Sequence, residues 1–375
     1  MCDYNFDSRM ENPKQIKRYQ KRIMAFITGF LVVLVAGCGG GGGGISQSVS
    51  SLPRLQVVGN EIRDENGNRL VLKGVNALDP ASMVKYYNHF GEEYFKKMRE
   101  WGAKIVRIPV HYPAFKFFEK IKEGSYLRLL DQAVEWSARN GMYVVIDFHS
   151  IGWPPTGEYQ KVQTPDPNWG QIYYFTASEL KDFWKRVSRH FANDSRIAFF
   201  DLFNEPAKGL PNGQDTSLQA WLEWRDFAEN LIDIIRENDP KRLVLVGGLQ
   251  FAYDIRYAKD YPIRRDGVVY SVHIYPWSLM PGDWHANWDT AFANNASVRP
   301  ILVGEVGFDP NSTEEGLKGT ADDFGIPLID EYLKPRNIGW LAWNFSPEWT
   351  PCLLLNWNYE PTASGSFFKD RLPSP

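Results

Sequence analysis

Short apolar runs alternate with helix-like segments along most of the chain. A short, almost unbroken apolar run is typical of a strand that is buried on both faces. On this pattern the predicted strands are Leu70–Asn76, Lys104–Pro109, Tyr143–His149, Ile197–Asn204, Leu243–Gly247, Val268–His273, Ile301–Glu305 and Ile338–Trp343. The predicted helices are Glu92–Trp101, Tyr126–Asn140, Glu179–Phe191, Leu218–Asn238, Ala252–Asp260, Trp288–Asn295, Asp322–Lys334 and Phe367–Leu372.

Eight strands, each followed by a helical segment, predict an α/β fold of the (β/α)8 TIM barrel type. Ahead of the first strand, Leu55–Val58 and Asn60–Arg63 alternate weakly, and Asp64–Gly67 is a turn signal. We expect a short N-terminal β-hairpin there. A doubly wound open sheet is the alternative, but no Gly-x-Gly-x-x-Gly turn follows any predicted strand.

The first 54 residues are expected to lie outside the barrel. A basic stretch, the apolar run Ile23–Ala36 and then small residues have the layout of a secretory signal, here residues 1–37. The apolar run is short for spanning a bilayer. Because Cys38 follows directly, the segment resembles a bacterial lipoprotein signal, which implies lipidation of Cys38. An uncleaved signal anchor is the alternative.

The predicted organisation is therefore a signal peptide (1–37), a lipidated cysteine with a Gly/Ser-rich tether (38–54) and one catalytic domain (55–375). We expect an exported protein: a cell envelope lipoprotein of the outer membrane or cell surface, or an extracellular protein. The lipid anchor would be its only contact with a membrane.

Composition narrows the possible partners. Net charge is −3 with both signs mixed, and no basic stripe follows residue 22, so we expect no nucleic acid partner. Apolar content of 43% supports a large core. We expect the protein to be a monomer. The 14 tryptophans fit either a Trp-rich core or stacking against sugars. Of the three cysteines, only Cys352 falls in the barrel, so no intrachain disulfide is expected.

Chemically capable residues gather at the predicted strand ends. In a barrel of this kind the active site is built at the carboxyl ends of the strands. Any one such residue is often only a satisfied polar or core residue, but here they recur from strand to strand. The candidates are Arg107, His149, Asn204, Glu205, His273, Tyr275, Glu305 and Trp343.

Between Leu55 and Arg371 the chain resembles glycoside hydrolase family 5, the cellulase family of retaining barrel enzymes. The resemblance rests on Val-Arg-Ile-Pro at 106–109, Asp-Phe-His at 147–149, Phe-Asn-Glu-Pro at 203–206, His-Ile-Tyr at 273–275, Gly-Glu at 304–305 and Trp343. It implies that Glu205 is the acid/base and Glu305 the nucleophile. It also implies that Arg107 and Tyr275 position and ionise Glu305, and that Asn204 binds the sugar 2-hydroxyl. His149 and His273 would contact the substrate or the catalytic carboxylates, and Trp343 would form the floor of the central subsite.

The chemistry of glycosidic cleavage supports a carboxylate pair independently. One carboxylic acid protonates the leaving oxygen while a second carboxylate attacks the anomeric carbon. Arg107 would favour the ionised form of Glu305, whose charge would keep Glu205 protonated. This chemistry needs no metal, and the sequence has no His-Glu-x-x-His and no Cys/His cluster. We therefore expect no cofactor and no catalytic metal.

A long aromatic segment, Ser150–Ala177, follows the third predicted strand. It contains Trp153 and Trp169, and similar aromatic material occurs at Trp277. A loop of this length is usually functional or disordered, and its aromatics argue for order. We expect these tryptophans to line the substrate cleft, with packing on the outside as the alternative.

The sequence thus predicts a retaining endo-β-1,4-glucanase of the cellulase type, acting on β-glucan polysaccharides or oligosaccharides. A β-mannanase, or a mixed-linkage or exo-acting β-glucanase, remains open because loops choose the sugar in this family. A surface glycan-binding lipoprotein with a decayed site is the alternative outside enzymes, although both carboxylates are present. A purely structural lipoprotein is disfavoured by the residues at the strand ends.

Overall fold

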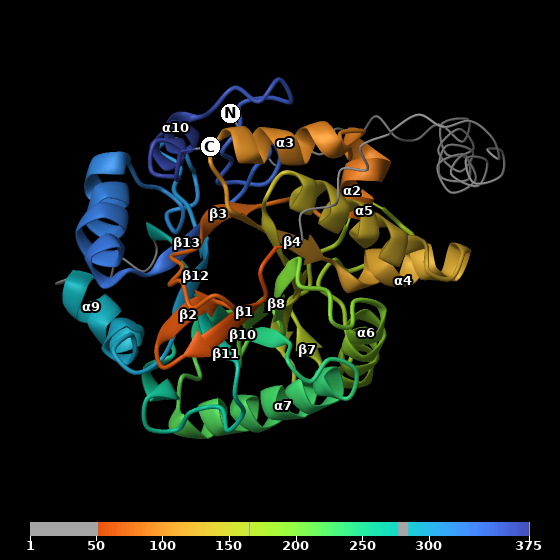
Figure 1. Ribbon diagram of the computed structural model, residues 1–375, viewed down its shortest axis with the longest axis horizontal. Helices are drawn as coiled ribbons and strands as arrows, with labels where there is room; N and C mark the ends of the chain where they lie inside the picture. Colours follow the sequence, from red (N-terminus) through yellow and green to blue (C-terminus); the bar gives the residue numbers. More distant parts are fainter. Residues whose placement is uncertain (1–51, 165, 277–283, 375) are drawn as a thin grey trace.

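Eight parallel strands close into a barrel with helices around it (Figure 1). The structure is a computed structural model that describes residues 52–164, 166–276 and 284–374. The strands follow one another around the barrel in the order β10, β11, β12, β13, β3, β4, β5, β8. The predicted (β/α)8 barrel is confirmed.

The barrel strands coincide closely with the predicted ones. They are β3 (Lys73–Asn76), β4 (Ile105–Val110), β5 (Tyr143–Phe148), β8 (Ile197–Asp201), β10 (Leu243–Gly247), β11 (Val268–Ile274), β12 (Ile301–Val306) and β13 (Gly339–Ala342). The principal helices are α3 (Glu92–Glu100), α4 (Tyr112–Ile121), α5 (Ser125–Arg139), α6 (Ala177–His190), α7 (Leu218–Arg236), α9 (Trp284–Ala291), η5 (Ala321–Leu333) and α10 (Ala363–Lys369). Shorter elements are α2 (Pro80–Ser82), η1 (Met83–Tyr87), α8 (Leu249–Ala252), η2 (Arg256–Ala258), η4 (Ala293–Asn295) and η6 (Lys334–Arg336).

Local sequence signals explain where several helices begin and end. The Thr176 hydroxyl accepts from the backbone N–H of Glu179 at the start of α6, and Ser217 caps α7 in the same way. Gly141 follows α5 with φ +70°, directly after the capping residue Asn140. Glycine tolerates this left-handed conformation at no steric cost.

Three local assignments differ from the sequence prediction. Helix α4 was not predicted, because the prediction placed one helix after each strand and here two helices, α4 and α5, follow β4. Phe115 and Phe118 of α4 are buried and pack in the core. The segment predicted as one helix, Ala252–Asp260, forms only the short turns α8 and η2. The segment of η5 is a π-helix that contains Pro327, whose missing N–H is incompatible with a regular α-helical ladder.

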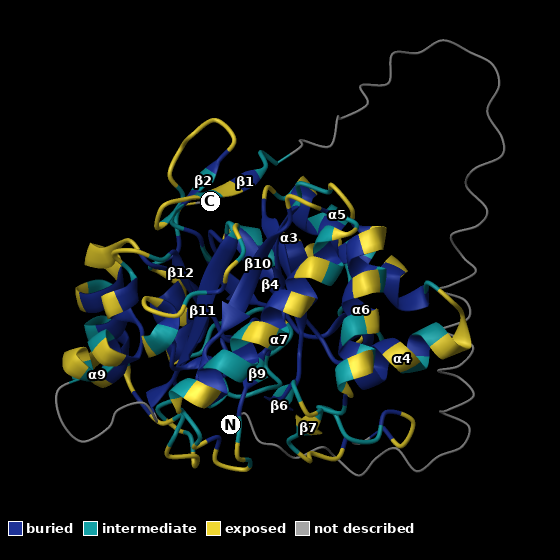
Figure 2. Ribbon diagram, turned by 90° about the horizontal axis from the view of Figure 1, so that it is seen from below, coloured by how far each residue is buried: buried dark blue, intermediate teal, exposed yellow. Residues whose placement is uncertain are grey.

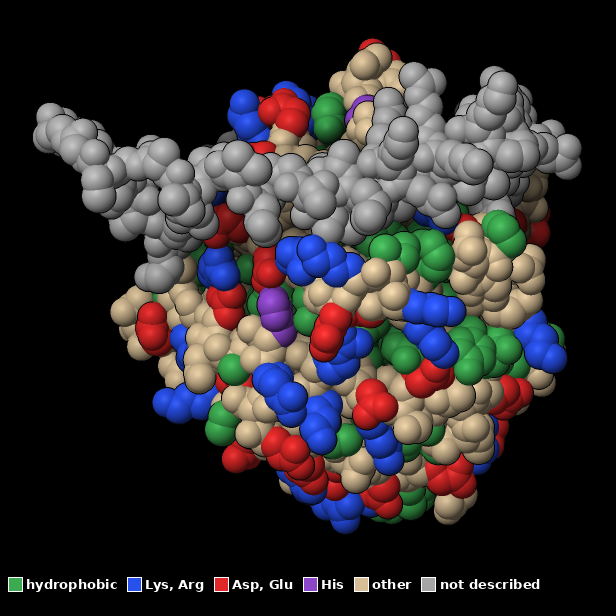
Figure 3. Space-filling model, turned by 90° about the vertical axis from the view of Figure 1, so that its right-hand side faces the viewer, with side chains coloured by type: hydrophobic (Ala, Val, Ile, Leu, Met, Phe, Trp, Pro, Cys, Tyr) green, Lys and Arg blue, Asp and Glu red, His purple; other side chains and the backbone are tan. Residues whose placement is uncertain are grey.

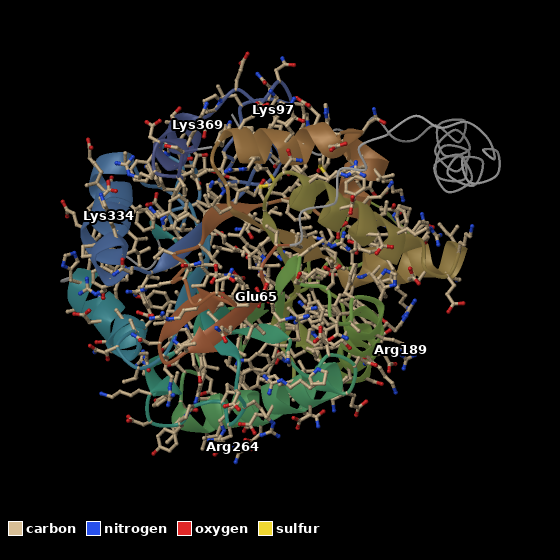
Figure 4. The ribbon with its side chains drawn as sticks, viewed as in Figure 1. Glu65, Lys97, Arg189, Arg264, Lys334 and Lys369 are labelled. Carbon is tan, nitrogen blue, oxygen red and sulfur yellow. The ribbon has the colours of Figure 1, made fainter. Side chains whose placement is uncertain are left out.

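The N-terminal hairpin is present, with its turn displaced from the predicted position. Strands β1 (Leu55–Val58) and β2 (Glu61–Asp64) are antiparallel and turn at Gly59–Asn60, where Gly59 has φ +62°. Leu55 and Ile62 of the hairpin belong to one buried apolar cluster with residues of the barrel strands. Figure 2 shows β1 and β2 together at one end of the molecule. Figure 4 shows Glu65, which follows β2, near the barrel axis, while labelled residues such as Lys334 lie at the periphery.

The barrel interior has an apolar layer and then a polar layer. The hairpin residues join an apolar cluster that includes Leu72, Ile105, Val145, Phe199, Val269 and Leu341. On several of the same strands the next inward positions, two or four residues further along, are polar: Asn76, Arg107, Asp147, Asp201, Ser271 and His273. Because side chains alternate between the two faces of a strand, both sets point into the barrel. The hairpin thus closes one end, and the polar layer faces the other.

The outer surface carries mixed charge. Figure 3 shows Lys and Arg side chains interspersed with Asp and Glu on one face. Surface ion pairs of the protein include Lys116–Glu179 and Arg196–Glu135. Among the described residues no helix has the length and apolarity needed to cross a membrane.

Some predictions fall outside the described residues. They are the signal segment 1–37, the lipidation site Cys38 and the substrate contact Trp277. Cys352 is buried, but the other two cysteines lie in the undescribed N-terminal segment. The predicted absence of an intrachain disulfide therefore stays a prediction.

Candidate active site

Arg107 is the centre of the polar layer. It lies in the middle of β4 rather than at its end, and its side chain is fully buried. A guanidinium has five N–H donors. Four hydrogen bonds run to Asp201 Oδ2 at 2.8 Å, Asn76 Oδ1 at 3.1 Å, Glu305 Oε1 at 2.7 Å and Asn204 Oδ1 at 2.8 Å, and Asp147 Oδ2 forms an ion pair with Arg107 at 3.0 Å. Five segments of the barrel are thereby tied to one side chain.

The layer holds more carboxylates than cations. Burial opposes the charge on Arg107, but Asp147, Asp201 and Glu305 outweigh it and raise the pKa of Arg107. Burial raises the pKa of Asp147 to about 7, and burial together with the charge of Asp147 raises the pKa of Asp201 to about 8, although Arg107 opposes both shifts. In the described chain Asp147 Oδ1 and Asp201 Oδ1 have no hydrogen-bond partner. The arrangement therefore retains protons near neutral pH.

Glu305 is positioned by two donors. It lies one residue before the end of β12, where the pairing register with β11 shifts. Arg107 donates to one carboxylate oxygen, and the Tyr275 hydroxyl donates to the other at 2.7 Å. Burial raises the pKa of Glu305 to about 7, while Arg107 and Tyr275 lower it. Both donors favour the ionised form, as expected of a nucleophile.

Glu205 lies in a different electrostatic environment. It follows β8 in the two-residue strand β9 (Glu205–Pro206), which pairs with β6 (Ile151–Trp153). Its carboxyl group contacts His273, whose Nδ1 is 3.0 Å from Glu205 Oε1. Burial, and then the charge of Glu305, raise the pKa of Glu205 well above its usual range. Burial and Arg107 lower the pKa of His273, so this imidazole is neutral.

The two glutamates are close to each other. One carboxylate oxygen of each and a ring nitrogen of His273 all lie within 4.8 Å of one another. Among the described residues this trio is the one group whose side chains could together hold a metal ion. Two carboxyl groups and an imidazole are also the groups that acid–base chemistry uses. The expected absence of a catalytic metal stays a prediction.

A cavity of ≈ 600 Å³ opens onto this pair. Among the predicted residues His149, Asn204, Glu205, Tyr275, Glu305 and Trp343 line it. The Trp343 ring stacks on His149 with centroids 5.5 Å apart and lies 6.5 Å from the ring of Trp349. Arg107 and His273 do not line the cavity and instead act on the lining residues. The structure thus brings the predicted pair and its supports to one site.

Two predicted substrate contacts, Trp153 and Trp169, are packed inside the protein and away from the other predicted residues. Trp153 is 2% exposed and lies beneath Lys208, and Trp169 is 6% exposed and packs against Tyr86 and Lys85. Neither lines the cavity. Burying a large apolar ring in the core is favourable in itself. An aromatic loop has the same sequence pattern whether its rings are buried in this way or line a binding cleft. From that loop, Ile151 and Tyr173 reach the cavity.

The sequence analysis missed several residues of the site. Asn76, Asp147 and Asp201 surround Arg107, and a polar residue inside an otherwise apolar strand was an available signal for all three. The cavity is also lined by Pro211, Asn212, Gln214, Gln250, Phe251, Glu314, Leu317, Trp349, Thr350 and Pro351. These come from loops, whose approach to the site depends on the tertiary fold.

A (β/α)8 barrel with two neighbouring carboxyl groups at its open end is typical of one class of enzymes, the glycoside hydrolases of this fold. The chain belongs to the cellulase family, glycosyl hydrolase family 5, whose model matches residues 63–348.

The chain is similar to characterised β-glucanases and endoglucanases at moderate sequence identity. A crystal structure of the β-glucanase SdGluc5_26A from Saccharophagus degradans superposes with a TM-score of 0.77 at 29% identity, covering 87% of this chain and 95% of that one. The same enzyme is also known in complex with cellotetraose. Endoglucanase A of Butyrivibrio fibrisolvens is 24% identical over 78% of this chain and 60% of its own length. Endoglucanase E-5 of Thermobifida fusca is 23% identical over 81% and 58%. The chain thus spans about 60% of the length of these curated relatives.

We predict that Tyr275→Phe shifts the pH profile upward. The phenol donates to ionised Glu305, so its loss raises the pKa of Glu305 above about 7. A hydrogen bond to a charged group contributes about 1.5–3 kcal/mol, or about one to two pH units. The ascending limb of kcat/KM against pH should move up by that amount, whereas Tyr159→Phe, outside the cavity, should leave it in place. An unmoved limb in Tyr275→Phe would contradict the assigned role.

We predict that Asp201→Asn changes how stability depends on pH. With a pKa of about 8 when folded and 3.8 ordinarily, Asp201 keeps a proton that the unfolded chain releases. The wild-type free energy of unfolding therefore falls between these pH values, by at most about 1.4 kcal/mol per unit. Asparagine cannot titrate, so thermal melts should show the variant gaining on wild type from pH 5 to pH 8. Exposed Asp322→Asn is the control, and parallel curves for Asp201→Asn would refute the prediction.

Proposed function

We propose that the protein is a retaining endo-β-1,4-glucanase that cleaves β-glucan chains by double displacement. The proposal rests on the separation of the carboxyl groups: oxygens of Glu205 and Glu305 lie within 4.8 Å of each other. Retaining enzymes place these groups about 5 Å apart, whereas inverting enzymes need about 6.5–9.5 Å to admit a water.

In the first step a carboxylate oxygen of Glu305 bonds to the anomeric carbon, the bond from that carbon to the glycosidic oxygen breaks with its electron pair going to the oxygen, and Glu205 gives its proton to that oxygen. Arg107 and Tyr275 stabilise the ionised nucleophile with bonds of 2.7 Å each. Glu205 has no arginine or lysine partner among the described residues, and the charge of Glu305 favours its protonated form. The two environments assign opposite protonation states to two chemically similar groups.

In the second step the roles of Glu205 reverse. Its carboxylate takes a proton from a water, the water oxygen bonds to the anomeric carbon, and the bond to Glu305 breaks with its electron pair returning to the carboxylate. The neutral imidazole of His273, 3.0 Å from Glu205 and 3.6 Å from Glu305, can orient both groups without adding charge.

The substrate assignment draws on the cavity lining and on the relatives. Trp343 presents an aromatic surface to the cavity, which suits the C–H face of an equatorial pyranose. Asn204 accepts from Arg107 through its oxygen, so its amide N–H groups are left to donate to a sugar hydroxyl. Relatives named as β-glucanase and endoglucanase favour glucan over mannan. Mannan, mixed-linkage glucan and exo action remain the competing assignments.

We predict that the two glutamates fail in different ways. Glu305→Ala should lose activity, and azide should restore it with an inverted product because a small anion can take the place of the carboxylate. Glu205→Ala should fall by about 10²–10⁴ in kcat/KM on glucan, and much less on substrates with an activated leaving group that needs no acid. Product anomers by NMR and initial rates are the measurements. Equal loss of activity in both variants, without rescue by azide, would contradict the assigned roles of the two glutamates.

We predict that cellulose-type β-1,4-glucan is preferred over mannan and that chains are cut internally. Initial rates on carboxymethylcellulose, mixed-linkage glucan, xyloglucan and mannan rank the substrates, and Glu305→Ala serves as the blank. Internal cleavage lowers viscosity early relative to the release of reducing ends. A higher kcat/KM on mannan, or reducing ends released without loss of viscosity, would replace the proposed specificity.

A further inference from the structure

The lining of the cavity has an uneven charge. In the described part of the chain its acidic residues are Glu205, Glu305 and Glu314, and no lysine or arginine lines it. Arg107 lies beneath the lining, in the buried polar layer. His149 does line the cavity, but burial lowers its pKa well below the usual range, so its ring is neutral. The described wall of the cavity therefore presents carboxyl groups with no cation beside them.

Glu314 is the acidic residue of this lining that has no part in the two catalytic steps. Its side chain is exposed, whereas Glu305 is 3% exposed. Among residues 52–164, 166–276 and 284–374 no hydrogen bond or ion pair holds the carboxylate of Glu314. A carboxylate in this position acts on whatever enters the cavity, because no neighbouring cation offsets its charge.

The backbone of Glu314 is held in place although its side chain is exposed. Its N–H donates to the Ser312 hydroxyl at 3.0 Å, and its carbonyl oxygen accepts from the same hydroxyl at 3.2 Å. That carbonyl oxygen also accepts from the backbone N–H groups of Leu317 at 2.9 Å and Lys318 at 3.1 Å. Leu317 itself lines the cavity. These bonds keep the carboxylate of Glu314 at the cavity wall.

The loop that carries Glu314 is anchored beside the nucleophile. It joins β12, the strand of Glu305, to η5. At its base Asp309 N–H donates to the carbonyl oxygen of Leu317 at 2.8 Å. A Cβ added to Gly319 would lie 2.9 Å from the side chain of Pro276, which follows β11, so the two segments are in close contact. The loop is thereby packed against both strands that position the nucleophile.

We propose that Glu314 selects substrates by charge, so that the cavity takes neutral glucan chains in preference to anionic ones. The inference rests on the proposed function and specifies the class of β-glucan that the site accepts. A sugar that carries a carboxylate, such as a uronic acid or a carboxymethyl ether, is repelled by Glu314, whereas an uncharged hydroxyl group is not. Like charges at an exposed position repel each other only weakly through water, so the residue biases the choice of substrate without making it absolute.

The test compares three cellulose ethers that differ in charge. Hydroxyethylcellulose is neutral, carboxymethylcellulose is anionic, and hydroxyethylcellulose with quaternary ammonium groups is cationic. Glu314→Gln removes the charge and keeps the size of the side chain. At an ionic strength of about 10 mM, where the Debye length is about 30 Å, the ratio of kcat/KM on the anionic ether to that on the neutral ether should rise about two- to fivefold. The ratio of the cationic to the neutral ether should fall by a similar factor.

Matched variants separate local charge from net charge and from folding. Glu314→Lys reverses the sign and should move both ratios further than Glu314→Gln does. Glu65→Gln makes the same change in net charge at an exposed residue of the hairpin end of the barrel (Figure 4), so its ratios should stay at about the wild-type values. At about 1 M salt, where the Debye length is about 3 Å, the differences between variants should disappear. Thermal melting of every variant checks that it is folded.

Each outcome decides the inference. Opposite shifts on the anionic and cationic ethers in Glu314→Gln, larger in Glu314→Lys and absent at high salt, support selection by charge. Unchanged ratios in folded variants, equal shifts in Glu65→Gln, or shifts that persist at high salt overturn the inference while the proposed glucanase function stands. If the wild-type protein cleaves none of the three ethers and no other β-glucan, the proposed function fails, and this inference fails with it.

Discussion

The active site depends on one buried ion cluster. Arg107 donates four hydrogen bonds, to acceptors from β3, β8, β12 and the segment after β8, and forms an ion pair with Asp147 of β5. These segments meet only when the barrel is closed, so the cluster links the chemistry to the fold. Burying such a cluster is costly, because the desolvation of the charges offsets much of their attraction. The cluster determines the positions of side chains in the site, because the same guanidinium holds both Glu305 and Asn204.

The cluster also explains why the two glutamates differ. Three carboxylates around one guanidinium leave an excess of negative charge, and burial raises the pKa values of Asp147, Asp201 and Glu305. Glu305 nevertheless receives two direct donors, whereas Glu205 receives neither and faces a neutral histidine. Of the two catalytic candidates, Glu205 therefore holds its proton more strongly. The difference arises from contacts rather than from residue type.

The strands could be predicted well from the sequence because buried parallel strands are continuous apolar runs. The carboxyl ends of the predicted strands then indicate where the active site of a barrel lies. The sequence analysis placed Glu205 and Glu305 correctly at the open end. It could not separate Tyr173, which reaches the cavity, from Trp169, which is buried, because both are aromatic residues of one loop. It also gave no sign of Phe251, since no local pattern predicts left-handed backbone at residues other than glycine. These positions are set by tertiary contacts.

The polar layer is possible because of what lies two positions earlier on the same strands. Ile105 precedes Arg107, Val145 precedes Asp147 and Phe199 precedes Asp201, and these apolar residues join the cluster closed by the hairpin. Alternation with period two puts both members of each pair inside the barrel. The apolar layer blocks water from one end, so the charges above it act in a medium of low dielectric where each contact is stronger. A slip of one residue in any strand would exchange charged and outward-facing positions, which ties the register of the barrel to the electrostatics of catalysis.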